Sequence, residues 1–419
     1  MPLFLPPPAL VTAPWTLQAT GLNPHAPVTI DAQTTDRHGE RWRSQAVFQP
    51  EASGVVDVAR HAPLSGSYAG TDPRGLLWSL RPRTDLIPAI FETPPDGYEV
   101  AVQLWQGGRL LEEGRTFRQT RRPGLESVDV RQSGLHGTLF CPPAEVPLRG
   151  AALQLGGSEG GLSPAVGALL ASEGFLVLSV AYFGVPGLPP SLINLPLEYF
   201  HRAISFLRSC PEAAGRRIGI TGASKGAEAA LLLGATYPDE VGAVAAFAPS
   251  GLVFEGIDRV GSHPPGQPKS SWSLGGQPLP YLPYRVDWGA VFAGPPPIRL
   301  TPAHQDALHG ADPGTVAAAT IPTERIRGPV LLVSGGDDQV WNAHELSMVA
   351  QQRRDVAGRL TEHLTDPRAG HALSVPGFPT FIRTPWTALG GTDEANARLQ
   401  FRAWERTLDV LGSVWLEEG

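Results

Sequence analysis

The sequence predicts an all-β domain followed by an α/β domain whose sheet is mostly parallel. Residues 28–119 contain short runs in which apolar and polar side chains alternate, which is typical of strands in an antiparallel β-sandwich. From Ala151 onward, apolar runs alternate with helix-like segments, which predicts a mostly parallel sheet covered by helices on both faces. The length of 419 residues also exceeds one typical domain. We therefore expect domains at 1–125 and 126–419.

The first domain is expected to contain several short strands and a tight hairpin. Gly107-Gly108 separates the last long run from Leu110-Leu111 and Thr116-Phe117, and two glycines between strands favour a two-residue turn. We expect the domain to end near Arg121–Gly124, and we find no group of catalytic side chains in it. The main strands are predicted at Val28–Ala32, Trp42–Phe48, Val55–Val58 and Tyr98–Leu104.

The second domain is expected to begin with a hairpin of Val128–Arg131 and Leu135–Phe140. Helices are predicted at Pro164–Ser172 and Leu197–Leu207. Thr392 can cap a closing helix whose apolar residues fall near one face, so this helix is expected to pack on the sheet. The buried strands are predicted at Ala151–Leu155, Phe175–Ala181, Arg217–Thr221, Val241–Ala248, Val330–Ser334 and Leu360–Leu364.

The turn Gly222-Ala223-Ser224-Lys225-Gly226 lies between a β-branched strand and an alanine-rich helix. The pattern G-x-S-x-G in this context is a nucleophile elbow, in which a serine sits on a strained turn at the carboxyl end of a strand. Ser224 is therefore the candidate nucleophile of an α/β-hydrolase fold. The backbone N–H of Lys225 is expected to stabilise an oxyanion, and the charge of Lys225 is expected to be incidental. The alternative is a glycine-flanked turn without a role in catalysis.

A buried strand at Val330–Ser334 ends in Gly335-Gly336-Asp337-Asp338. A carboxylate at this position can accept the Nδ1–H of a histidine and fix the tautomer that takes a proton from serine. We choose Asp338 as this acid and interpret Asp337 as a turn residue.

His371 follows the last predicted strand, on a loop that contains Ala369-Gly370-His371. The order Ser224, Asp338, His371 is the order of the catalytic triad in α/β-hydrolases. His363 is expected to be structural, and His344 is expected on the helix after Asp338. His304 and His309 lie in a loop region and lack metal-ligand spacing.

A second oxyanion donor is expected from the glycine-rich loop after the strand at Ala151–Leu155. This loop reads Gly156-Gly157-Ser158-Glu159-Gly160-Gly161, and we choose Gly157 or Ser158 as the donor. The loop matches neither G-x-G-x-x-G nor G-x-x-x-x-G-K, so it does not indicate a nucleotide site.

The least regular stretch lies at about 250–320 and is rich in proline and glycine. A long loop of this kind is either a functional lid or a disordered segment. Its aromatic residues favour a lid over an apolar substrate, or they serve only to pack the loop on the sheet. They are Trp272, Tyr281, Tyr284, Trp288 and Phe292.

Composition excludes several classes of protein. The net charge of −7 provides no footprint for nucleic acid or an anionic membrane. The two cysteines, Cys141 and Cys210, have no metal or redox spacing. The first residues lack a basic region and contain several prolines, so we do not expect a signal peptide. No apolar run is long enough to span a bilayer, and the expected location is the cytoplasm.

Several further stretches agree, in order, with one known family. Trp42-Arg43-Ser44, Gly66-Ser67-Tyr68 and Gly75–Ser79 lie in the first domain, and Gly390-Gly391-Thr392 leads into the closing helix. Between them, the run Ala181–Gly184 and the residues Leu188–Pro190 and Leu197–Phe200 precede the elbow. Together these stretches resemble the acyl-CoA thioesterases and bile acid-CoA:amino acid N-acyltransferases, and the resemblance covers nearly the whole chain. It implies an immunoglobulin-like domain before the α/β-hydrolase domain.

The resemblance also implies a function. Ser224 would attack an acyl thioester to form an acyl-serine, with Asp338 and His371 as acid and base, and water would release the free acid and coenzyme A. Transferases of this family typically carry cysteine at the elbow, so Ser224 favours hydrolysis. Coenzyme A would be part of the substrate and no cofactor is expected.

The receptor for the negative charges of coenzyme A is not evident from the sequence. Arg285, Arg299 or Arg353-Arg354 could serve, although Arg353-Arg354 also fits a solvated helix face. The alternatives are a carboxylesterase for uncharged esters, an N-acyltransferase, and a non-catalytic binding scaffold.

Overall fold

The computed structural model describes residues 3–84, 87–261, 263–264, 267–373 and 375–416. The chain forms two compact units. The first contains the residues up to 122 together with 375–386 and 393–401, and the second contains 123–374, 387–392 and the residues from 402 on. The predicted limits assign 375–401 to the second domain, whereas the contacts of 375–386 and 393–401 place these two segments in the first unit.

The first unit is built from two β-sheets. In the larger sheet, β9 (Gly97–Gln106) pairs antiparallel with β10 (Arg109–Gln119) and with β4 (Val28–Thr35), and β4 pairs with β5 (Arg41–Phe48). This sheet also includes β2 (Ala9–Leu10), β7 (Ser65–Gly66) and β8 (Arg81–Pro82). The smaller sheet contains β1 (Leu3–Phe4), β3 (Gln18–Ala19) and β6 (Val56–Asp57). The unit also contains the short helix α1 (Gly75–Trp78) and the first part of α9 (Asp393–Leu416).

Alternating burial explains the strands of this unit. In β5 the side chains of Trp42, Ser44, Ala46 and Phe48 are buried, while the residues between them are exposed or half-buried. This is the period-two pattern of a strand with one face on the core. The turn at Gly107-Gly108 joins β9 to β10, and both glycines have positive φ, as a tight hairpin requires. The predicted all-β domain is confirmed.

The second unit is built on an eight-stranded sheet with the order β11-β12-β14-β13-β16-β17-β20-β21. The hairpin strand β12 pairs antiparallel with β11 and β14, and the other neighbours pair parallel. The strands are β11 (Glu126–Asp129), β12 (His136–Cys141), β13 (Gly150–Leu155), β14 (Phe175–Ala181), β16 (Ile218–Ala223), β17 (Val241–Phe247), β20 (Val330–Gly335) and β21 (Thr361–Asp366).

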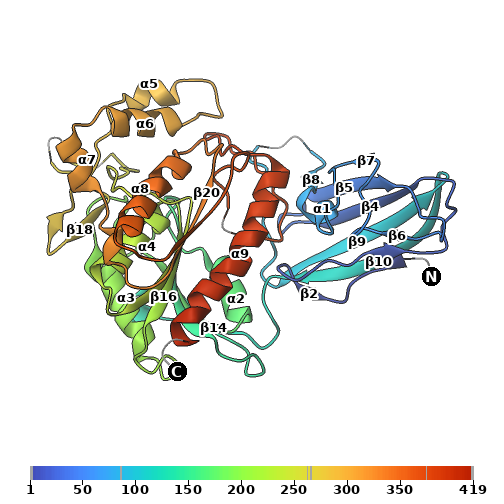
Figure 1. The fold of residues 1–419 in the computed structure, drawn as a ribbon, viewed down its shortest axis with the longest axis horizontal. Coiled ribbons are helices and arrows are strands. Elements are labelled where there is room, and N and C mark those ends of the chain that lie inside the picture. Colours follow the sequence, from blue (N-terminus) through green and yellow to red (C-terminus); the bar gives the residue numbers. More distant parts are fainter. Residues whose placement is uncertain (1–2, 85–86, 262, 265–266, 374, 417–419) are drawn as a thin grey trace. The chain divides into compact units, whose positions relative to one another are not determined.

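Helices cover both faces of this sheet, with α3, α4 and α8 on one side and α2 and the second half of α9 on the other (Figure 1). Glycines allow the close approach of α9, because a Cβ on Gly219 would lie 2.4 Å from Leu411 and one on Gly242 would lie 2.3 Å from Val414. The helices are α2 (Pro164–Ser172), α3 (Leu197–Ser209), α4 (Lys225–Thr236), α8 (Ala343–Val356) and α9 (Asp393–Leu416), with 3₁₀ turns at Arg131–Ser133 and Thr323–Arg325. The predicted α/β-hydrolase fold is confirmed.

The stretch 250–320 is more regular than the sequence suggests. It contains β18 (Trp272–Leu274), which pairs with β15 (Leu195–Pro196) and β19 (Gln277–Pro278), and three short helices. These helices are α5 (Trp288–Phe292), α6 (Thr301–His309) and α7 (Pro313–Ala319). A buried cluster joins the stretch to the region after β20, with members that include Phe254, Leu282, Ala307, Trp341 and Leu346.

Within the ranges that the structure describes, no helix is both long enough and apolar enough to cross a membrane.

Candidate active site

Ser224 lies on the turn between β16 and α4, in a strained conformation. Its φ is 54° and its ψ is −122°, a region that non-glycine residues rarely adopt. A Cβ on Gly222 would lie 2.2 Å from the carbonyl oxygen of Gly226, and one on Gly226 would lie 2.1 Å from that of Gly156. Only glycine fits at both positions, so the turn has the local geometry expected of a nucleophile elbow.

Asp338 and His371 come together at the end of β20. The Nδ1 atom of His371 lies 2.7 Å from Oδ2 of Asp338, and the side chains are 14% and 1% exposed. Because a carboxylate only accepts hydrogen bonds, His371 carries its proton on Nδ1 and leaves Nε2 free to accept another. The sequence-predicted acid and base are therefore neighbours.

The carboxylate of Asp338 is held by its own loop. Its Oδ1 accepts the N–H groups of Val340 at 2.9 Å and Trp341 at 3.2 Å, so Oδ2 is directed to the histidine. Asp337 is occupied elsewhere, since its Oδ2 accepts the N–H of Gly391 at 2.9 Å. This arrangement agrees with the choice of Asp338 over Asp337.

Ser224 lies at the same edge of the sheet. Among the hydrogen bonds of the described residues, none joins its hydroxyl to His371. Both residues are near Trp341, which lines a pocket together with Ser224 and lies with its ring centre 6.2 Å from that of His371. A serine–histidine hydrogen bond is often long before substrate binds, so this geometry is compatible with a triad.

The backbone around Ser224 presents three amides that were predicted as oxyanion donors. The N–H groups of Lys225 and Ser158 have no hydrogen-bond partner among the described residues, and both residues line the pocket with Ser224. The N–H of Gly157 instead donates to the carboxylate of Glu159 at 2.9 Å. Two of the three predicted donors are therefore available, and the third is occupied.

Tyr182 orients the loop that carries two of these amides. Its hydroxyl donates to the carbonyl oxygens of Gly156 at 2.7 Å and Gly157 at 3.2 Å. In a trans peptide the N–H points away from the C=O, so the N–H groups of Gly157 and Ser158 point away from Tyr182. Burial raises the pKa of Tyr182 well above its usual value, so the hydroxyl keeps its proton and remains a donor.

The pocket beside Ser224 has a volume of about 260 Å³ and several aromatic residues in its walls. Tyr284, Trp288 and Phe292 line it from the 250–320 stretch, so these aromatic residues do border the site. The hydroxyl of Tyr284 lies 3.0 Å from Nε2 of His304, and Nδ1 of His304 lies 3.1 Å from the carbonyl of Leu300. Burial lowers the pKa of His304 to about 3, so this imidazole is neutral.

Lys225 places an ammonium group beneath the pocket. Its Nζ donates to Oε1 and Oε2 of Glu228 at 3.2 and 3.1 Å and to the Ser271 hydroxyl at 2.9 Å. Glu228 also accepts the indole N–H of Trp272 at 2.7 Å. Burial lowers the pKa of Lys225 and raises that of Glu228, and each charge opposes the shift of the other. The side chain of Lys225 thus has a structural partner.

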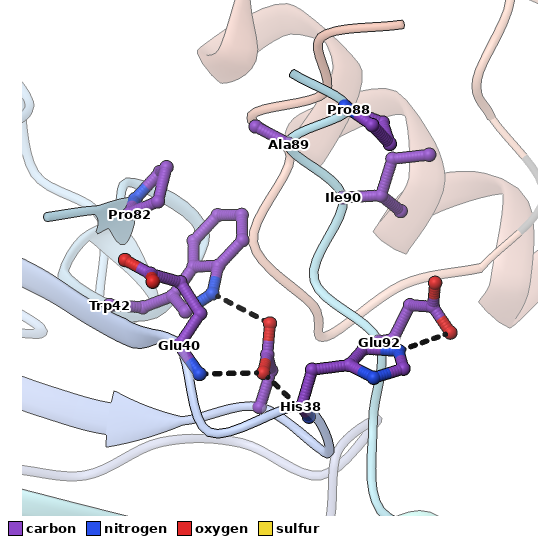
Figure 2. Close-up of a pocket in the computed structure, with 9 residues that line it drawn as sticks. His38, Glu40, Trp42, Pro82, Pro88, Ala89, Ile90 and Glu92 are labelled. Atoms are coloured by element: carbon purple, nitrogen blue, oxygen red, sulfur yellow. Dashed lines mark hydrogen bonds and ion pairs between the residues drawn. The ribbon is translucent and has the colours of Figure 1, made fainter. Parts of the chain in front are cut away.

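A second pocket lies within the first unit and has a volume of about 290 Å³. Figure 2 shows His38 next to Glu92, at 3.2 Å, with Trp42 and Glu40 nearby. Asp36 accepts the indole N–H of Trp42 at 3.2 Å. Among the described residues, no serine, threonine or cysteine lines this pocket, so they offer no hydroxyl or thiol nucleophile there. The candidate active site is therefore the pocket at Ser224.

Sequence comparisons identify relatives over nearly the whole chain. The family signature described as "Acyl-CoA thioester hydrolase/BAAT N-terminal region" matches residues 12–132, and "BAAT / Acyl-CoA thioester hydrolase C terminal" matches 195–271 and 299–413. Acyl-coenzyme A thioesterase 6 of Mus musculus is 30% identical over 94% of this chain and 91% of its own length. The chain belongs to the acyl-CoA thioester hydrolase/BAAT family.

Other members of this family match equally well. Acyl-coenzyme A thioesterase 1 of Homo sapiens is 30% identical over 94% of this chain and 91% of its own length. Peroxisomal succinyl-coenzyme A thioesterase of Mus musculus is 29% identical over 95% and 93%. Among solved structures, an acylaminoacyl peptidase bound to a chloromethyl ketone covers 98% of this chain and 62% of its own, at 13% identity and a TM-score of 0.43. That likeness is too distant to carry an argument.

For this member of the family, two expectations about the site need correction. Arg354 is fully buried and donates to four backbone carbonyls, so it neither contacts solvent nor is available to coenzyme A. Arg353 forms an ion pair with Glu324 at 2.6 Å. His304, expected on a loop, lies on α6 and in the wall of the pocket.

Sequence reasoning also missed two groups near the nucleophile. The pair of Lys225 and Glu228 has the three-residue spacing of a helical ion pair, which could have been read from the sequence. Glu159 could have been noticed as a carboxylate two residues after a candidate amide donor.

In the described part of the chain, no group of three or more His, Cys, Asp or Glu side chains is placed to hold a metal ion.

Proposed function

We propose that this protein is a serine hydrolase that cleaves acyl-CoA thioesters to a free acid and coenzyme A. One observation carries the proposal. The Asp338–His371 pair lies at the end of β20, at the sheet edge where Ser224 occupies a strained elbow beside an aromatic pocket. Relatives named acyl-coenzyme A thioesterases support the choice of thioesters over other acyl compounds.

In the proposed mechanism, His371 Nε2 takes the proton of the Ser224 hydroxyl while Asp338 accepts the Nδ1–H of the resulting imidazolium. The serine oxygen forms a bond to the thioester carbon, and the carbonyl oxygen becomes an oxyanion. The N–H groups of Lys225 and Ser158 are the proposed donors to that oxyanion. The tetrahedral intermediate then expels the thiolate of coenzyme A, which receives the proton from His371.

Water completes the proposed cycle. His371 takes a proton from a water molecule, and the resulting hydroxide attacks the acyl-serine carbon through a second oxyanion. Ser224 leaves as the alkoxide and regains its proton from His371. Each step uses side chains and backbone of this chain alone, so we propose that no separate cofactor takes part and that coenzyme A enters only as substrate.

The pocket supports an acyl substrate with a charged carrier. Its walls of Tyr284, Trp288, Phe292 and Trp341 favour an apolar acyl group. Lys269 also lines the pocket, and Arg259 follows the pocket residue Asp258 and is exposed. Lys269 is paired with Glu255 at 3.4 Å and Asp258 is itself acidic, so the exposed guanidinium of Arg259 is the proposed contact for the phosphates of coenzyme A.

The test measures thiol release from a series of acyl-CoA esters and, in parallel, hydrolysis of nitrophenyl esters. Ser224→Ala should abolish turnover of both, while Ser205→Ala, at an exposed serine on α3, should not. Full activity of Ser224→Ala would refute the nucleophile. Hydrolysis of nitrophenyl esters without acyl-CoA hydrolysis would favour the carboxylesterase, and formation of an N-acyl amino acid would favour the transferase.

The proposed compartment is the cytoplasm. Relatives carry peroxisomal and mitochondrial names, so the family occupies several compartments. Imaging of a fluorescent fusion of the full chain against markers of these compartments tests the assignment.

A further inference from the structure

The glycine-rich loop beside the nucleophile, residues 156–161, carries one acidic side chain. Oε1 of Glu159 accepts the N–H of Gly157 at 2.9 Å and the hydroxyl of Ser163 at 3.3 Å. Glu159 is exposed, so its carboxylate lies on this amide in contact with solvent and not inside the core. The contact therefore covers one of the amides predicted to bind an oxyanion.

The carboxylate of Glu159 is close to Ser224. A Cβ placed on Gly157 would lie 2.7 Å from Oε2 of Glu159 and 3.3 Å from Cβ of Ser224. These two atoms are thus no farther apart than the sum of those distances, about 6 Å. A negative charge at this range acts directly on the place where an oxyanion would form.

The backbone of the loop holds Glu159 in this position. Nη1 of Arg259 donates to the backbone carbonyl of Glu159 at 2.6 Å. Gly160 and Gly161 follow with φ values of +70° and +75°, and the N–H of Gly161 donates to the carbonyl of Phe183 at 3.0 Å. Gly160 and Gly161 thus have a backbone conformation that favours glycine. The backbone position of Glu159, from which its side chain extends, is therefore fixed.

A carboxylate on this amide conflicts with catalysis in two ways. Hydrogen bonds to a charged acceptor are stronger than those to a neutral carbonyl, so an entering thioester carbonyl cannot easily replace the Glu159 carboxylate. The fixed negative charge also repels the oxyanion that forms on the substrate. Both effects end when the side chain rotates into solvent, which requires that it give up its hydrogen bonds to Gly157 and Ser163.

We propose that Glu159 is a gate on the oxyanion hole. In the free protein its carboxylate occupies the Gly157 amide, and it leaves this amide before the acyl group reacts at Ser224. The Lys225 and Ser158 amides remain open in the gated state, and the Gly157 amide becomes a further donor once the gate is open. This inference rests on the proposed role of Ser224 as nucleophile, and it assigns a regulatory role to a residue that takes no part in the bond-making steps.

The test compares Glu159→Ala and Glu159→Gln with the unmodified protein by the rate of covalent labelling with an uncharged fluorophosphonate. This probe needs the serine and the oxyanion hole but not the binding of coenzyme A. The reaction rate of an anionic acyl-CoA would change on loss of any nearby negative charge. The labelling rate of the uncharged probe depends instead on whether the Gly157 amide is available. Intact mass spectrometry measures the second-order rate constant and confirms a single label.

The gate predicts that Glu159→Ala is labelled about three- to tenfold faster, the effect of removing a solvent-exposed hydrogen bond to a charged acceptor. Glu159→Gln can still accept the Gly157 N–H but has no charge, so its rate should lie between the other two. Glu145→Gln, at an exposed glutamate elsewhere in the second unit, serves as the matched control and should be unchanged.

The outcomes separate the gate from the proposed function. Labelling of the unmodified protein combined with equal or slower labelling of both Glu159 variants would overturn the gate and leave the serine hydrolase in place. Absence of labelling in the unmodified protein and in all variants would refute the assignment of Ser224 as the nucleophile. Both proposals would then be wrong. Thermal unfolding of each variant shows whether it is folded, and Glu159→Gln, which has the same shape as the native side chain, provides the test if Glu159→Ala does not fold.

Discussion

The ion pair of Lys225 and Glu228 begins one residue after the nucleophile and is buried. The side chains are 3% and 0% exposed, and the ammonium group lies 3.1–3.2 Å from both carboxylate oxygens. Ser271, Trp272 and the backbone of Phe254 provide further hydrogen bonds. Removal of one charge leaves the other buried without its counter-ion, so Lys225→Met should strongly destabilise the second unit.

The expected loss follows from the burial of both groups. Breaking a buried ion pair by removal of one partner costs about 3–5 kcal/mol. For a unit of this size, each kcal/mol lowers the melting temperature by about 2–4 °C, so Lys225→Met should melt about 6–20 °C lower. In Lys225→Met/Glu228→Gln no charge remains, and the new amide can still accept the Trp272 indole N–H. The double variant should therefore be more stable than Lys225→Met alone.

Urea unfolding followed by circular dichroism measures these free energies, with thermal melting as a second readout. The two substitutions lie one helical turn apart at residues that hydrogen-bond to each other, so non-additive effects are expected. The reasoning would be refuted by a loss of less than about 1 kcal/mol in Lys225→Met, since a surface ion pair contributes no more than that. It would also be refuted by a double variant that loses the sum of both single effects.

Three further predictions concern the site. Asp338→Asn should lower kcat about 10⁴-fold, because the Val340 and Trp341 N–H groups hold the amide oxygen and turn the amide NH2 toward Nδ1, which selects the wrong histidine tautomer; thiol release from an acyl-CoA measures this, and a loss below tenfold would contradict the triad. Tyr182→Phe should lower kcat about tenfold with little change in KM, because the Gly157 and Ser158 amides lose their orientation; a change in KM alone would contradict a positioning role. His304 has a folded-state pKa of about 3, below the unfolded value, so the unfolded chain binds more protons and stability is lost as pH falls below about 6.5. Between pH 7 and pH 5 this amounts to about 2 kcal/mol, and urea unfolding at both pH values should show a smaller loss in His304→Gln than in the unmodified protein.

The sequence was sufficient to predict the main strands and the Asp–His pair, because both depend on local signals. The apolar runs at β13, β14, β16, β17 and β20 are flanked by turns, and all their residues are buried except the half-buried Ala223 at the end of β16. In a parallel sheet the carboxyl ends of all strands meet at one edge, so residues just after separate strands become neighbours. Asp338 and His371 follow β20 and β21, which is why their places after predicted strands, together with chain order, predicted their contact.

The walls of the pocket could not be predicted in the same way. Tyr284 and His304 lie 20 residues apart in the 250–320 stretch, and their contact depends on Phe254, which packs against both rings, and on Trp341, which packs against His304. Neither residue has a periodic pattern around it that specifies a partner. The return of 375–386 and 393–401 to the first unit has the same cause, because contacts between segments hundreds of residues apart leave no signal in a single sequence.

Glu159 combines the two cases, because its hydrogen bond is local in the sequence but its position beside Ser224 is not. Its contact with Gly157 spans only two residues, and such short contacts between a carboxylate and a backbone N–H are common in turns. A turn-forming role alone would account for the hydrogen bond, but not for its place next to Ser224, which depends on how β13 and β16 pair. The register sets Leu155 opposite Gly222, so the residues that follow each strand emerge side by side. The local contact of Glu159 with Gly157 thus affects Ser224 only because the sheet brings the two loops together. Acidic residues close to the ends of parallel strands should therefore be considered as neighbours of a nucleophile at the same edge.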